Sequence, residues 1–204
     1  MAEQEQRRAV LRLASASPRR RQLLDLIGVP HVVTPADIDE TPHAAESAVN
    51  YVVRLAREKA AAVWARHQDL PVLAADTTVV VADEILGKPE SETDAISMLG
   101  KLSGRTHHVY TGIALHTASG VMQDNSSTQV SFAPISIGEI RAYWASGEPP
   151  GKAGAYAIRG LGAVFVSGIA GSYTGVVGLP LFETAEMLRS AGIPVWNGAT
   201  GEGA

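Results

Sequence analysis

The most continuous apolar run of the chain is PVLAADTTVVVA, residues 71–82. It is rich in β-branched residues and does not alternate with polar ones, which predicts a strand buried on both faces at the centre of a sheet. Asp76 interrupts the run, and a carboxylate that is buried without a partner is costly. We therefore expect Asp76 to pair with a cation or to bind a metal at the end of the strand, where α/β enzymes place general bases. A structural aspartate that caps local backbone is the alternative.

The segments on either side predict an alternation of strands and helices. Toward the N-terminus we expect strands at 10–14 and 30–34, a helix from Pro18 and a long helix from about residue 46. Toward the C-terminus we expect a helix at 94–102, a hairpin of strands at 108–116 and 121–132, and a short helix at 138–145. A glycine-rich extended region at 151–180 and a last helix at 181–191 follow. This pattern is typical of an α/β fold. Because no repeat or linker divides it, we expect one domain over residues 1–204, with flexible tails at 1–8 and 197–204.

Composition excludes several classes of protein. With 46% hydrophobic and 19% charged residues, the chain of 204 residues falls outside the range of disordered proteins. A net charge of −4 provides no global attraction for a polyanion, so nucleic-acid binding is not expected. The absence of cysteine excludes disulfides, thiolate metal sites and cysteine nucleophiles. The start, MAEQEQRRAV, lacks the apolar core of a signal peptide, and no apolar run reaches the length of a membrane helix, so we expect a soluble, cytoplasmic protein without membrane contact.

A strand-to-helix turn near the N-terminus has the chemistry of a phosphate site. Ser17 is placed to cap a helix that begins at Pro18, and Arg19 and Arg20 lie in the first turn of that helix. Cations are unfavourable there unless an anion binds, because the free N–H groups already make the turn positive. Together with the Ser15 hydroxyl, these groups would bind phosphate oxygens. An ordinary Ser-Pro cap followed by solvated arginines is the alternative.

Two lysines and an acidic loop add to the candidate groups. Lys59 lies on the flank of the apolar face of the helix from residue 46, which directs its ammonium toward the core or a cleft edge; a snorkelling surface lysine is the alternative. Lys88 is presented by a Gly-Lys-Pro turn. The acids Asp37, Asp39 and Glu40 carry oxygen donors of the kind that suits Mg²⁺ or Mn²⁺, although acidic loops are mostly solvated.

Other features are weaker indicators of a site. The adjacent His107 and His108 would point to opposite faces of a strand and could not share a metal, so we interpret them as structural. The small residues of 151–160 and 171–180 would let a flat ligand lie against the backbone, and tight strand packing explains them equally well. The chain has no P-loop, G-x-S-x-G, H-E-x-x-H or G-x-G-x-x-G motif, which disfavours the standard NTPases, hydrolases, zincins and dinucleotide enzymes.

Several segments together resemble the Maf family of nucleotide pyrophosphatases, which is named for septum formation. They are LASASPRR (13–20), ESA with YVVRLAREKA (46–60), LAADTTVV with ILGKP (73–89), GRTHHVYTG (104–112) and GKAGAYAIRG with GSYTGVVGLPL (151–181). These segments appear in the family's order and span nearly the whole chain. The resemblance implies a mixed twisted sheet flanked by helices, in two lobes around a deep nucleotide cleft, as in the Maf/ITPase-like fold.

The resemblance also implies an activity, the hydrolysis of a nucleoside triphosphate to the monophosphate and pyrophosphate with a divalent cation, which is Mg²⁺, Mn²⁺ or Co²⁺. Asp76 matches the catalytic acidic residue, which activates water and binds the metal, and Glu40 matches a second acid that serves the metal. The family's triphosphate-binding positions are matched by Ser15, Ser17, Arg19, Arg20, Lys59 and Lys88. Several cations can offset the charge that moves onto the leaving pyrophosphate. A homodimer is expected for this family.

The AGAYAIRG segment resembles the branch of the family that acts on dTTP and UTP. In that branch, selectivity for the base is associated with the positions of Arg19, Thr77 and Arg159, and the last of these usually holds Gln. A glutamine amide donates and accepts hydrogen bonds, whereas a guanidinium only donates, so this difference could shift the base preference.

The expected function is therefore a housecleaning pyrophosphatase for dTTP and UTP, with modified pyrimidine nucleotides as an open extension. One alternative is a nucleotide-binding regulator of cell division with little turnover. The other is a pyrophosphatase with a different base preference, such as 7-methyl-GTP.

Overall fold

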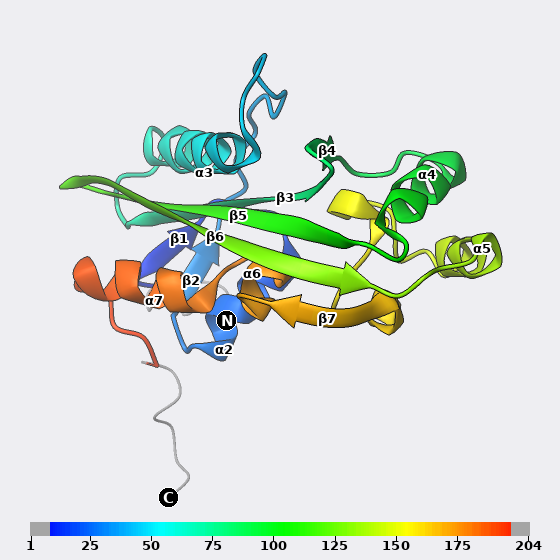
Figure 1. Cartoon of the computed structure of the whole chain (residues 1–204). Helices are drawn as coiled ribbons and strands as arrows, with labels where there is room; N and C mark the ends of the chain where they lie inside the picture. The colour runs from blue at the N-terminus through cyan, green and yellow to red at the C-terminus, as the bar shows by residue number, and fades with distance from the viewer. Residues whose placement is uncertain (1–8, 197–204) are drawn as a thin grey trace, which may run out of the picture. The chain divides into compact units, whose positions relative to one another are not determined.

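The computed structural model describes residues 9–196 and has an α/β fold (Figure 1). Its elements are β1 (Leu11–Leu13), α2 (Pro18–Leu26), β2 (His31–Val33), α3 (Ala48–Trp64), β3 (Val72–Val81), β4 (Glu84–Leu86), α4 (Glu92–Leu102), β5 (Thr106–Thr117), β6 (Gly120–Phe132), α5 (Ile137–Ala145), the 3₁₀ helices η1 (Ala153–Ala155) and η2 (Leu161–Phe165), β7 (Val166–Ala170), α6 (Tyr173–Val177) and α7 (Leu181–Ser190). Within this described part of the chain, no helix is long and apolar enough to cross a membrane.

The strands form one mixed sheet. Its order is β2-β1-β3-β5-β6-β7, with β4 paired to β3 beside this path. β1 pairs in parallel with β2 and β3, whereas the pairs β3–β4 and β6–β7 are antiparallel. β5 and β6 are neighbours in the sheet and are joined by two residues, which confirms the predicted hairpin. The prediction of a mixed sheet with helices is confirmed as well.

The chain divides into two compact units. Unit 1 comprises the described parts of residues 1–76, 111–125 and 178–204, and unit 2 comprises residues 77–110 and 126–177. The predicted single domain over residues 1–204 and the predicted nucleotide cleft stay predictions. The predicted tails at 1–8 and 197–204 lie outside the described residues.

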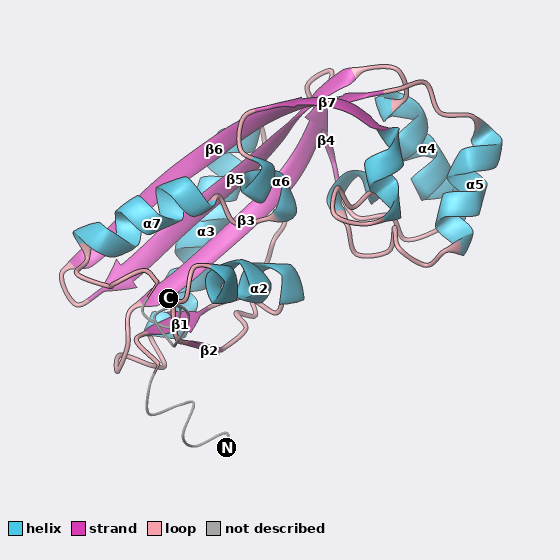
Figure 2. Cartoon of the chain, turned by 90° about the horizontal axis from the view of Figure 1, so that it is seen from below, coloured by secondary structure: helices cyan, strands magenta, loops and turns pink. Residues whose placement is uncertain are grey.

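Unit 1 is built on a close contact between α3 and the sheet. α3 covers one face of the strands of this unit, and α2 and α7 cover the other (Figures 1 and 2). The contact is lined by small side chains, among them Ala56 and Ala60 of α3 and Ala74 of β3. At Gly112 of β5, an added Cβ would lie 2.5 Å from the carbonyl oxygen of Val52, so only glycine permits this approach.

Unit 2 has its own apolar core. α4 and α5 pack against each other, and the core includes Leu99 and Leu102 of α4 and Tyr143 of α5. His107 lies inside it, 1% exposed, and shares a hydrogen bond of 2.9 Å with the Tyr156 hydroxyl. Burial lowers the pKa of His107 to about 4, so its ring is neutral at physiological pH. This buried environment agrees with the interpretation of His107 as a structural residue.

Most predicted elements lie where the sequence pattern places them, and one region does not. The glycine-rich stretch 151–180 was predicted to be extended, but it contains η1, η2 and α6, and only β7 is a strand. That prediction is therefore wrong for most of the region. Its physical reason is that closely spaced glycines permit tight turns, such as Gly154 with φ of 67°, which break extended backbone into short helical turns.

Candidate active site

The first cluster of predicted site residues lies where β1 turns into α2. Ser15 follows β1 and is buried, and Ser17 is the N-cap of α2, although its side chain makes no capping hydrogen bond in the described structure. Instead the Ser15 hydroxyl accepts the backbone N–H of Ser17 at 3.2 Å and a hydrogen bond from Arg20 Nη1 at 3.1 Å. Arg20 Nε donates to the carbonyl oxygen of Gly178 at 2.8 Å, which fixes the guanidinium beside the turn.

The electrostatic environment of Arg20 links this turn to the predicted acids. Burial lowers the pKa of Arg20, and the negative charges of Asp76 and Glu40 oppose that shift, while the neighbouring Arg19 adds to it. α2 has no acidic residue in its first turn. The turn therefore presents arginines and backbone N–H groups without a carboxylate of its own.

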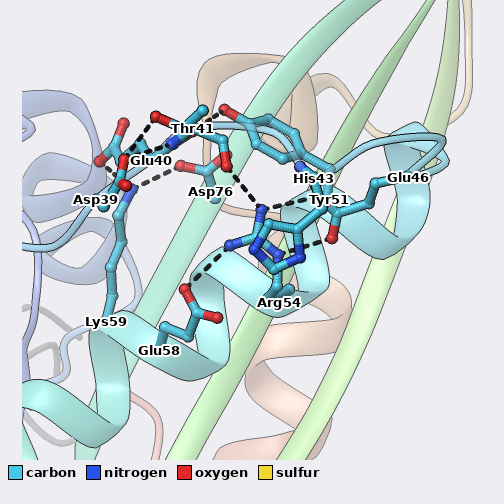
Figure 3. Close-up of polar contacts among 10 residues, drawn as sticks. All are labelled: Asp39, Glu40, Thr41, His43, Glu46, Tyr51, Arg54, Glu58, Lys59 and Asp76. Carbon is cyan, nitrogen blue, oxygen red and sulfur yellow. Dashed lines mark hydrogen bonds and ion pairs between the residues drawn. The ribbon is translucent and has the colours of Figure 1, made fainter.

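The second cluster is a lysine held between two carboxylates. Lys59 Nζ lies 2.6 Å from Glu40 Oε1 and 2.7 Å from Asp76 Oδ1 (Figure 3). Lys59 and Asp76 are each 7% exposed, so the alternative of a solvated surface lysine is wrong. Asp76 lies in the middle of β3 rather than at its end, which corrects the predicted strand-end position. The buried Asp76 carboxylate therefore has a charged partner, the Lys59 ammonium.

The sequence of α3 explains why Lys59 points inward. Ser47 caps the helix by accepting the backbone N–H of Asn50 at 3.3 Å. From there, residues at helical spacing are buried, and Lys59 follows Leu55 by one turn on that buried face. The ammonium is therefore carried to β3 by a helix whose apolar face is fixed against the sheet.

The acidic loop contributes one of its three candidate acids to this cluster. Glu40 reaches Lys59, whereas the Asp39 carboxylate turns back and accepts the backbone N–H and the hydroxyl of Thr41 at 2.9 and 2.6 Å. Asp37 is exposed. No group of three histidine, cysteine or acidic side chains suited to a metal occurs within residues 9–196. The acids that contact the Lys59 ammonium are Glu40 and Asp76.

The other predicted site residues belong to unit 2. Thr77 follows Asp76 in β3 and is partly buried, and Lys88 and Arg159 are exposed. Within this unit, the backbone N–H of Gly154 donates to the carbonyl oxygen of Gly87 at 3.0 Å, which connects the Gly-Lys-Pro turn to the segment that precedes Arg159. The roles predicted for these residues stay predictions.

Sequence reasoning missed two residues that hold the acidic loop, Tyr51 and Arg54. The Arg54 side chain is only 17% exposed and forms an ion pair with Glu46 of the loop at 2.7 Å. Tyr51 donates to the carbonyl oxygen of Glu40 at 2.9 Å. The contacts to the loop leave no periodic pattern, because they join a helix to irregular backbone. The only local signal is the four-residue spacing of Arg54 and Glu58, which are 3.1 Å apart.

Comparison with known proteins places the chain in a family. The dTTP/UTP pyrophosphatase of Methylobacillus flagellatus is 54% identical over 185 residues, covering 90% of this chain and 93% of that protein. The dTTP/UTP pyrophosphatase of Myxococcus xanthus is 54% identical over 189 residues, covering 91% and 94%. Among solved structures, the Staphylococcus aureus Ham1 protein is similar with a TM-score of 0.46 and 16% identity, over 60% of this chain and 71% of that one. Because a family model described as Maf-like protein matches residues 10–191, and relatives match at this identity, the chain belongs to the Maf-like protein family.

Proposed function

We propose that this protein hydrolyses dTTP and UTP to the nucleoside monophosphate and pyrophosphate. The observation that carries the proposal is the 54% identity, over 90% of the chain, to a protein named dTTP/UTP pyrophosphatase. The chemistry of unit 1 supports the proposal. The turn with arginines supplies groups that can bind phosphate, and the carboxylate pair around Lys59 supplies a base that can accept a proton from water.

The phosphates would bind at the turn between β1 and α2. Ser15 and Arg20 are already joined at 3.1 Å, so the hydroxyl and the guanidinium are held in one geometry before substrate arrives. The guanidinium of Arg19, in the first turn of α2, would add further donors. In the proposed role, Lys59 and Lys88 bind further phosphate oxygens.

Asp76 would take the proton of the attacking water. The water oxygen forms a bond to the α-phosphorus, the α–β phosphoanhydride bond breaks, pyrophosphate leaves and the water proton moves to the Asp76 carboxylate. Lys59 lies 2.7 Å from Asp76 Oδ1 and restricts this carboxylate to one orientation. A base that is already oriented loses little entropy in the reaction.

Glu40 and Asp76 are the residues that would hold a divalent cation. Two carboxylates fit Mg²⁺ or Mn²⁺, because such ions commonly bind one or two protein carboxylates and complete their shell with water and substrate phosphates. Their oxygens both lie within 2.7 Å of Lys59 Nζ, which places the two donors in the same locality. When bound, the cation would supply positive charge to the phosphates and the leaving pyrophosphate.

The decisive experiment is steady-state release of pyrophosphate from dTTP, UTP, CTP, GTP, 7-methyl-GTP and pseudouridine triphosphate, with Mg²⁺, Mn²⁺ or Co²⁺. We expect dTTP and UTP to be preferred and Asp76→Asn to lose activity while still binding triphosphate. Asp124→Asn, an exposed acid of β6, is the matched control and should keep activity. Preference for another base would assign a different substrate, and tight binding without release would favour a regulator.

Base selectivity can be tested at Arg159. We propose that this residue takes the place of the glutamine of related enzymes and alters the contact with the base. Arg159→Gln should change the ratio of kcat/KM for dTTP to that for CTP, because an amide can accept from the base edge and a guanidinium cannot. An unchanged ratio would remove Arg159 from the base site.

The remaining expectations are tested separately. A homodimer would give twice the chain mass of 21.4 kDa in light scattering. A cytoplasmic location and the absence of nucleic-acid binding stay predictions, checked by cell fractionation and by a filter-binding assay.

A further inference from the structure

The loop between β2 and α3, residues 34–47, carries Glu40 and is fastened by two side chains of α3 (Figure 3). The Tyr51 hydroxyl donates to the carbonyl oxygen of Glu40 at 2.9 Å. Arg54 Nη2 donates to the carbonyl oxygen of Thr41 at 3.2 Å. These are consecutive carbonyl groups, so the two bonds fix the backbone at the point from which the Glu40 side chain leaves.

The guanidinium of Arg54 is itself held by a bidentate ion pair. Its Nε and Nη2 each lie 2.7 Å from an oxygen of Glu46, and Nη1 lies 3.1 Å from Glu58. The Glu46 carboxylate also accepts the backbone N–H of His43 at 3.1 Å, which closes the far end of the loop. The Glu46 side chain is only 9% exposed, and the hydrogen bond from Arg54 lowers the pKa of Glu46 to about 2. The pair is therefore charged at neutral pH and geometrically defined.

The contact of Glu40 with Lys59 is too weak to order this loop. The Glu40 side chain is 42% exposed, and an ion pair at such a site contributes less than the cost of ordering the backbone of even a few loop residues. The order must come from groups that bind the loop backbone. Arg66 reaches the start of the loop, at the carbonyl oxygen of Pro35, over a long 3.5 Å. Tyr51 and Arg54 bind the backbone at Glu40 itself and at the next residue, and they stand on the same helix as Lys59.

We propose that Tyr51 and Arg54 are positioning residues, which hold the Glu40 carboxylate at Lys59 and Asp76. The inference rests on the proposed pyrophosphatase function and adds two residues to it. They act through the loop, by keeping Glu40 within reach of the partners that it needs when substrate binds. If they served only to stabilise the fold, their loss would lower stability without a specific effect on Glu40.

Tyr51→Phe removes one hydroxyl and gives the cleanest test. For pyrophosphate release, we expect kcat to fall roughly two- to tenfold, the equivalent of one hydrogen bond, while the KM for triphosphate changes little. Arg54→Lys keeps the charge and loses the bidentate geometry, so its effect should be larger. Arg57→Met, at an exposed arginine of the same helix, is the matched control and should behave like the wild type. An equal loss in this control would contradict the proposal.

A double-mutant cycle with Glu40→Gln separates positioning from stability. If Tyr51 acts through Glu40, Tyr51→Phe will have no further effect on kcat in the Glu40→Gln background. A loss of the same size in both backgrounds would overturn the inference. Thermal denaturation of each variant establishes that the compared chains are folded.

Two further readouts do not depend on turnover. In Tyr51→Phe, backbone hydrogen exchange of residues 34–47 should become faster. Binding of Mn²⁺ in the presence of inorganic tripolyphosphate, measured by the electron paramagnetic resonance signal of free Mn²⁺, should weaken. Unchanged exchange and unchanged Mn²⁺ binding would refute the positioning role. If the wild type releases no pyrophosphate from any nucleotide, the proposed function fails, whereas these two measurements, made on Tyr51→Phe and on Arg54→Lys, still decide whether Tyr51 and Arg54 hold the loop.

Discussion

Lys59→Met should destabilise the protein because it leaves two carboxylates together without their shared cation. Lys59 Nζ contacts both Glu40 and Asp76, at 2.6 and 2.7 Å. Methionine keeps an unbranched apolar side chain that can occupy the space of the lysine stem. The substitution therefore tests the charge more than the packing.

The magnitude follows from the burial of the three side chains. The Lys59 and Asp76 side chains are 8% and 11% exposed, and removing one partner of a buried ion pair costs about 3–5 kcal/mol, because a buried charge is left unpaired. The Glu40 side chain is 42% exposed and regains water, so its pair adds only about 0–1 kcal/mol. We expect a loss of about 3 kcal/mol in the free energy of unfolding, or roughly 6–12 °C in Tm for a chain of this size.

The assay is urea denaturation followed by circular dichroism, on Lys59→Met, Asp76→Asn and the double variant. Asp76→Asn removes the uncompensated charge, so the double variant should recover at least about 1 kcal/mol relative to Lys59→Met. Lys101→Met is the matched control, because Lys101 pairs with Glu84 at 41% and 53% exposure and should cost less than about 1 kcal/mol. A Lys59→Met variant as stable as the wild type, or no recovery in the double variant, would show that Asp76 does not depend on Lys59 for its charge.

Two further predictions concern buried residues, one inside unit 1 and one inside unit 2. In Gly112→Ala the new Cβ would lie 2.5 Å from the Val52 carbonyl oxygen, so we expect a loss of about 2–3 kcal/mol or more in urea denaturation, whereas Gly100→Ala, with open space around it, should be neutral or stabilising. His107 is neutral when folded, with its pKa lowered by burial to about 4 from 6.5, so the unfolded chain binds the additional proton. This contribution to stability is complete above pH 6.5 and is lost progressively as the pH falls toward about 4, by up to about 3 kcal/mol, and His107→Gln should flatten the wild-type curve in that window.

The buried elements could be predicted from the sequence because their signals are local. The run at 71–82 is continuously apolar and rich in β-branched residues, which predicts a central strand, and the helix from residue 46 shows its buried face in its spacing. The inward direction of Lys59 follows from that same face. The acid in the strand could be singled out because an unpartnered carboxylate does not belong there.

The partners of these residues could not be predicted in the same way. Glu40 meets Lys59 from a loop of irregular backbone, and no periodicity relates positions 19 residues apart on such a chain. The pairing of Arg54 with Glu46 likewise depends on how the loop folds back over α3, which no local pattern indicates. In the glycine-rich region, each glycine permits several turns, and the choice among them is made by tertiary contacts such as the bond from Gly154 to Gly87.

α3 connects the stability of unit 1 to its chemistry. Its alanines and the glycine at position 112 allow the helix to lie close to the sheet, and this closeness lets a lysine on the helix reach an aspartate in the middle of β3. The same helix carries Tyr51 and Arg54, which hold the loop of Glu40. The Asp76 carboxylate of the sheet and the Glu40 carboxylate of the loop thus meet at the Lys59 ammonium of α3. In the proposed reaction, groups that are fixed before substrate arrives would need little reorganisation when phosphate charge is brought to them, and this is the condition under which electrostatic catalysis is strongest.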